Sequence, residues 1–148
     1  MRFEVAGRGL LVLLIGVASM SARGESAVTS PMELRQIMQG MERGMLAITE
    51  AIAREEWMAV AAHAPLIANH PQPPMSERLQ ILGYFAAESG QFKQYDSETH
   101  QAALKLQESA LRRDGEVVID DFARLQKSCL ACHRHYRQEF VEHFYGGE

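Results

Sequence analysis

The sequence predicts an all-α fold in which four helices form an antiparallel four-helix bundle. In several long segments, apolar residues recur every three or four positions, which is the spacing of one face of an amphipathic helix. No segment shows sustained alternation of β-branched and aromatic residues, so strands are not expected. A tight connection near Asp114 brings two successive helices side by side, and an antiparallel bundle is the most economical packing for four helices.

The first two helices are predicted from their start signal and their apolar residues. Ser30 can cap the first helix, Pro31 suits its first position and Glu33 completes a capping box. A shorter second helix is predicted over residues 56–68, with a kink at Pro65. The core-facing stripe of the first helix consists of Leu34, Met38, Met41, Met45, Ile48 and Ile52.

The second half of the chain is predicted to hold two longer helices. Prolines and glycines keep residues 71–89 loosely organised apart from a short helical piece. A helix over residues 91–113 is expected to stop at Asp114–Gly115, and the last helix follows at once. The two cysteines fall on the core-facing stripe of this last helix, which consists of Val118, Phe122, Leu125, Cys129, Cys132, Tyr136 and Phe140.

The N-terminal segment has the pattern of a secretory signal. Arg2 and Arg8 precede the apolar run 10–18, which small residues follow. This run is shorter than the roughly 20 apolar residues that cross a bilayer, so a stable membrane span is not expected after processing. We expect residues 1–24 to be the signal peptide, with cleavage between residues 18 and 24, and residues 25–148 to be one domain in the bacterial periplasm.

Charge and size limit the classes of function. The chain has 148 residues with 15 basic and 19 acidic side chains, and removal of residues 1–24 takes away three basic and one acidic group, which leaves a net charge of −6. Nucleic acid is therefore not expected as a partner. A domain over residues 25–148 can bury a core without disulfides, so the two cysteines are free for chemistry. A homodimer is compatible with the sequence.

The sequence Cys129-Leu130-Ala131-Cys132-His133 is the attachment motif for a c-type haem. Its two thiols add across the haem vinyl groups as thioethers, and the adjoining histidine is then held where its imidazole can bind the iron on one axial side. We therefore predict one haem c, bound covalently through Cys129 and Cys132, with His133 as an iron ligand.

Three other uses of the cysteine pair need a context that this chain lacks. A thioredoxin-like redox pair sits at the start of a helix in a βαβ unit, whereas this pair lies far inside a C-terminal helix. A structural zinc site needs four ligands, and the sequence has no second CxxC or HxxxH pair. A disulfide between positions three apart would close almost no loop and would stabilise little.

With CLACHRHYR at residues 129–137 on its last helix, the chain resembles the cytochrome c′ family, the class II c-type cytochromes. The resemblance covers residues 25–148 and is strongest at Cys129 to Arg137. It implies that Arg137, in the pattern CxxCHxxYR, lies near the haem beside the histidine, although a surface position is the alternative. It also implies that Arg35 meets a haem propionate, and a solvent-facing arginine is an equal alternative.

The family divides by the sixth iron ligand, which is a methionine in low-spin members and absent in high-spin members. Residues 36–39 and 43–45 resemble the low-spin branch, which implies Met38 as the ligand. Helix lengths alone admit Met38 or Met41 and place Met45 too deep. The alternative is that these methionines only fill the core.

Histidine and methionine together saturate the iron, so we expect an electron carrier with a redox partner protein of unknown identity. Four cations of the last helix could form a docking rim for an acidic partner or an ordinary solvated face; they are Arg124, Lys127, Arg134 and Arg137. The alternative function is a five-coordinate cytochrome c′ that binds nitric oxide or carbon monoxide. An enzyme is not expected, because a peroxidase needs distal acid and base groups and no histidine of the sequence is convincingly placed for that role.

Overall fold

The protein is all-α, as the sequence predicts, and the computed structural model describes residues 32–146. No strand occurs among these residues. The expected signal peptide and the expected cap at Ser30 and Pro31 lie outside them. The helices are α1 (Glu33–Ala53), α2 (Trp57–Ala68), α3 (Met75–Tyr84), α4 (Ser89–Leu111) and α5 (Gly115–Tyr145), and a short 3₁₀ helix spans Ala86–Glu88.

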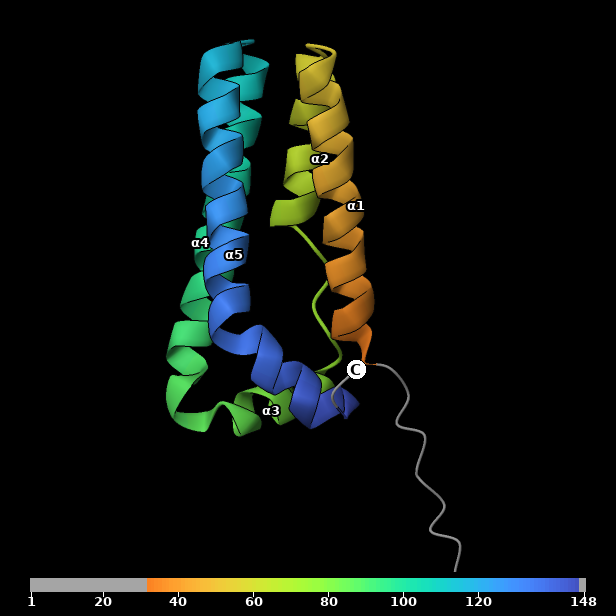
Figure 1. Ribbon diagram of the computed structural model, residues 1–148, viewed down its shortest axis with the longest axis vertical. Helices are drawn as coiled ribbons and strands as arrows, with labels where there is room; N and C mark the ends of the chain where they lie inside the picture. Colours follow the sequence, from red (N-terminus) through yellow and green to blue (C-terminus); the bar gives the residue numbers. More distant parts are fainter. Residues whose placement is uncertain (1–31, 147–148) are drawn as a thin grey trace, which may run out of the picture.

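The four long helices form two neighbouring pairs, α1 with α2 and α4 with α5 (Figure 1). Helix α2 also packs along α4, which joins the pairs. Helix α3 lies across the lower end of the molecule in this view, beside the last turns of α5 (Figure 1). The five α-helices of residues 32–146 pack together. Helices α1 and α5, however, do not pack closely against each other along their lengths, so the side of the molecule between them is open.

Two apolar clusters make up the core, and the cysteines lie where they meet. Cys129 packs against the larger cluster, which joins α1, α2, α4 and α5, and Cys132 packs against the smaller one at the α3 end. The cysteines therefore do lie on the core-facing stripe of the last helix, as predicted. Fully buried side chains of the larger cluster include Ile48, Val60, Ile67, Leu106, Val118 and Leu125, and the smaller consists of Ile81, Phe85, Tyr136 and Phe140.

Residues 71–89 are more ordered than the sequence indicates. They contain α3 and the 3₁₀ helix, and α3 is attached to the start of α1 by the buried side chain of Glu77. The two carboxylate oxygens of Glu77 accept hydrogen bonds from the backbone N–H groups of Glu33 (2.9 Å) and Leu34 (2.8 Å). A carboxylate at a helix N-terminus satisfies amides that have no partner within the helix and offsets the positive end of its dipole.

The connection between α4 and α5 differs from the prediction that Asp114–Gly115 stops the earlier helix. Helix α4 ends at Leu111, and Arg113 turns the chain with a φ of 58°. Asp114 instead caps α5, because its Oδ1 accepts a hydrogen bond from the N–H of Val117 at 3.3 Å. Gly115 opens α5 because the Trp57 indole lies where a Cβ would stand, at 2.9 Å from Trp57 Cζ2.

Pro65 lies inside α2, which continues past it to Ala68. Within residues 32–146, no helix combines the length and the apolar character that a membrane span requires.

The contact between Gly115 and Trp57 makes a prediction about stability. Alanine is usually favoured over glycine in a helix, but the added methyl group of Gly115→Ala would overlap the rigid indole ring. We expect this variant to lower the free energy of unfolding by about 1–3 kcal/mol, as overpacking does. In the control Gly83→Ala, the new methyl group meets nothing within 4 Å, and we expect a gain of about 0.5–1 kcal/mol. Urea unfolding followed by circular dichroism measures the free energy of unfolding of both variants. If Gly115→Ala is as stable as Gly83→Ala, the added methyl group does not clash with Trp57.

Candidate functional site

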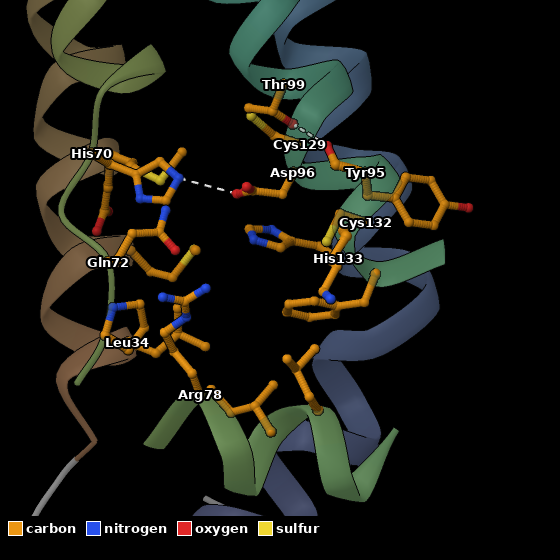
Figure 2. Close-up of a pocket in the computed structure, with 18 of the residues that line it drawn as sticks. Leu34, His70, Gln72, Arg78, Tyr95, Asp96, Thr99, Cys129, Cys132 and His133 are labelled. Carbon is orange, nitrogen blue, oxygen red and sulfur yellow. Dashed lines mark hydrogen bonds and ion pairs between the residues drawn. The ribbon is translucent and has the colours of Figure 1, made fainter. Parts of the chain in front are cut away.

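A pocket lies between α1 and α5, where the two helices do not pack together. Its cavity volume is about 250 Å³, and α1, the linker 69–74, α3, α4 and α5 all contribute to its walls (Figure 2). Residues far apart in the sequence meet here, and most of the wall is apolar. The sequence-predicted residues that line the pocket are Met38, Met41, Met45, Cys129, Cys132 and His133.

The two thiols face the pocket from one side of α5 and form no disulfide. Positions three apart on a helix lie on the same face, which places both sulfurs along one wall. Burial raises the pKa of Cys129. Burial, with the nearby negative charge of Asp96 and the second cysteine, raises the pKa of Cys132 to about 11. Both cysteines are therefore thiols at neutral pH, unlike a redox dithiol, in which a positive environment stabilises the thiolate.

His133 follows the second cysteine directly, and its ring points into the pocket (Figure 2). Partial burial lowers the pKa of His133, and the positive charge of Arg137, one turn further along α5, lowers it too. A neutral imidazole has a free lone pair, which is the form that binds a metal ion. Arg137 itself is exposed and is not part of the pocket wall. It affects the site through the action of its positive charge on the pKa of His133.

The three methionines line the opposite wall from α1. Met41 and Met45 pack against the same core cluster as Cys129, whereas Leu34 packs against the same cluster as Cys132. Met38 lies between these positions on α1 and is 37% exposed. Of the three methionines, Met38 therefore stands at the level between the two cysteines.

His70 and Asp96 form a charged pair across the pocket wall that sequence reasoning did not find. His70 Nε2 lies 3.1 Å from Asp96 Oδ1, and His70 Nδ1 lies 2.9 Å from the carbonyl oxygen of Pro71 (Figure 2). Both oxygens can only accept, so this geometry fits an imidazolium that donates from both ring nitrogens. The hydrogen bond that His70 donates to Asp96 raises the pKa of His70, and the same bond lowers the pKa of Asp96.

Two arginines, Arg35 and Arg78, lie differently with respect to the pocket. Arg35 does not line the pocket; its guanidinium carbon lies 4.3 Å from the centre of the Tyr145 ring. Arg78, which the sequence did not single out, extends from α3 into the pocket (Figure 2). No local sequence pattern indicates that Arg78 lies in the pocket, because its position depends on how α3 is attached to α1.

The side chains of the pocket do not form a site for a bare metal ion. In residues 32–146, no group of three histidine, cysteine or acidic side chains is arranged to hold one. The pocket offers a thiol pair, an imidazole and a thioether on facing walls instead. Such a set suits a macrocycle that brings its own equatorial nitrogens and takes only axial ligands from the protein.

Comparison with known proteins adds no family to this geometry. No protein-family model matches the chain, and no curated protein or solved structure matches it.

The His70–Asp96 pair predicts a pH-dependent coupling. Because the pKa of His70 is raised, its contribution to stability is present below the usual histidine value of about 6.5 and is lost as pH rises through the raised value. Because the pKa of Asp96 is lowered, its contribution is present above about 3.9 and is lost as pH falls through the lowered value. The pair should therefore stabilise the fold most between about pH 4 and 6.5.

A double-mutant cycle with His70→Gln and Asp96→Asn measures this coupling by urea unfolding. We expect a coupling of up to about 1 kcal/mol near pH 5.5, since Asp96 is partly exposed, and almost none near pH 9. An equal coupling at the two pH values would show that the pair is not ionic.

Proposed function

We propose that this protein is a periplasmic c-type cytochrome with one covalently bound haem c, and that it carries electrons. The observation that carries this proposal is the pocket in which Cys129, Cys132 and His133 face Met38. A redox dithiol, a zinc site or a disulfide at the cysteine pair would not use the adjoining histidine and the facing thioether together.

Four residues of the pocket and its apolar wall would each have a role in binding a haem. The protonated thiols of Cys129 and Cys132 provide the two thioether links, and His133 offers a neutral imidazole to one axial side of the iron. Met38, on the facing wall, would be the second iron ligand, and the mostly apolar lining would suit the apolar body of the haem. When bound, the haem supplies a one-electron redox centre, and a thioether ligand favours its reduced form.

The open side between α1 and α5 supports the same proposal. In this proposal α1, α2, α4 and α5 are the four helices of an antiparallel bundle, and the pocket lies on the side between α1 and α5. We infer that a haem completes the bundle by filling the space between α1 and α5. The resemblance to class II c-type cytochromes, with their haem motif on the last helix, agrees with this architecture.

Export and docking complete the proposal. The leader-like residues 1–24 would direct the domain over residues 25–148 to the periplasm, where a redox partner exchanges electrons with it. Of the four cations expected at the docking rim, Arg124 is engaged with buried Asp121 at 2.6 Å. Lys127, Arg134 and Arg137 are the exposed cations of α5 that would face an acidic partner.

One observation favours a second candidate, a five-coordinate cytochrome c′ that binds nitric oxide or carbon monoxide. Met38 is 37% exposed, so the described residues cover its side chain only in part. If the sulfur stays away from the iron, the sixth position is free for a gas. The spin state of the iron therefore decides between the two functions.

The first test concerns covalent attachment. In protein made with a c-type maturation system, we expect haem absorbance to stay with the denatured chain on a gel and to be lost in Cys129→Ala/Cys132→Ala. The control His133→Ala keeps both thioether positions, so its haem should stay on the gel while the normal low-spin spectrum disappears. Haem that stays with the double-alanine chain would refute the proposal.

The second test concerns the sixth ligand. We expect the oxidised protein to be low-spin, with the near-infrared charge-transfer band of methionine bound to ferric haem. Met38→Ala should become high-spin and take up carbon monoxide readily, whereas Met41→Ala, which changes a residue packed on the core, should keep the band. Wild-type protein that is already high-spin and binds carbon monoxide would favour the gas-binding function instead.

A further inference from the structure

Arg78 is a cation without a counter-charge in a mostly apolar pocket. Its side chain extends from α3 between the two long walls, and it is half-buried (Figure 2). No carboxylate of residues 32–146 forms an ion pair or hydrogen bond with it. A charged group that is partly withdrawn from water is stabilised by an ionised partner, and guanidinium is suited to carboxylates because its planar fork can donate two parallel hydrogen bonds.

The position of Arg78 is fixed from both ends of α3. At the start of the helix, the neighbouring residue Glu77 accepts two backbone hydrogen bonds from α1. At the far end, the Tyr84 ring stacks on His143 with centroids 4.0 Å apart, and the Phe85 ring lies edge-on to Tyr136 at 4.6 Å. Arg78 is thus held at the pocket by contacts to both α1 and α5.

The other charges of the pocket leave Arg78 as its main anion-binding group. Asp96 is engaged by His70, and the charges of this pair cancel. Glu42 lines the α1 wall but makes no ion pair with Arg78, and Lys93 on α4 is exposed.

We propose that Arg78 binds a carboxylate of the pocket's ligand, and that in the cytochrome this carboxylate is a haem propionate. The inference rests on the proposed function, and it assigns to α3 the part that the sequence assigned to Arg35 on α1. The contact would keep one propionate ionised and would define which edge of the macrocycle faces α3.

The test follows the ionisation of the propionates in the holoprotein. Haem labelled with carbon-13 at both carboxyl groups is incorporated biosynthetically, and the two resonances are titrated by NMR in the reduced form, which is diamagnetic when histidine and methionine both bind the iron. An opposite charge at about 4–6 Å lowers a carboxyl pKa by roughly 1–3 units. We expect Arg78→Gln to raise the titration of one propionate by about one unit, a tenfold change in proton affinity, and to leave the other nearly unchanged.

Matched variants separate charge from structure. Arg78→Leu, which suits the apolar wall, should give the same shift as Arg78→Gln and provides the result if the glutamine variant does not fold. Arg78→Lys keeps the charge and should restore most of the wild-type titration. Arg35→Gln, whose side chain lies over Tyr145, should leave both resonances unchanged.

The outcomes also separate this inference from the proposed function. If wild-type protein carries no covalent haem on a denaturing gel, the proposed function fails. If the haem is attached but both propionates titrate alike in wild type, Arg78→Gln and Arg78→Leu, the assignment of Arg78 is overturned. A shift in Arg35→Gln in place of the Arg78 variants would return the role to α1.

Discussion

The buried carboxylate of Glu77 is the contact on which the lower half of the molecule depends. By accepting hydrogen bonds from the first two free amides of α1, it ties α3 to α1, to which the chain connects it through a proline-rich linker. Helix α3 can then reach across to the aromatic side chains of α5. The pocket consequently has a closed lower end, although α1 and α5 hardly touch each other.

The wall of the pocket that α5 provides carries uncharged thiols and an uncharged imidazole, which suits covalent attachment and metal binding. Burial keeps the thiols protonated, and burial with the charge of Arg137 favours the neutral imidazole of His133. The charged groups of His70 and Asp96 neutralise each other on the neighbouring walls. The reactive wall is therefore uncharged and the positive charge of the pocket is concentrated at α3, so a ligand with an apolar body and an acidic edge fits both parts.

What the sequence could predict was determined by the distance along the chain between interacting residues. The long helices follow from local periodicity, and the placing of Cys129 and Cys132 on one face follows from their spacing within a single helix. Helix lengths alone brought Met38 or Met41 to the level of the CxxCH motif, and the resemblance to a known family was needed to choose Met38. The contacts of Glu77 with α1 span 43 and 44 residues and the His70–Asp96 pair spans 26, so no local pattern marks them. The contact of Arg35 with the Tyr145 ring is likewise long in range, because Tyr145 is near the other end of the chain.

The range of these contacts also bears on the order in which the molecule assembles. The α1/α2 and α4/α5 hairpins have short connections, and local contacts of this kind form early, whereas contacts that must first close a long loop form later. The lower end, held by Glu77 and the rings of α3, belongs to the later group. We expect an intermediate in which the hairpins exist but α3 is undocked, and in that intermediate the thiols of Cys129 and Cys132 are still open to the enzymes that would attach a haem. Docking of α3 would then narrow access to Cys132, which packs against the cluster that contains Ile81 and Phe85.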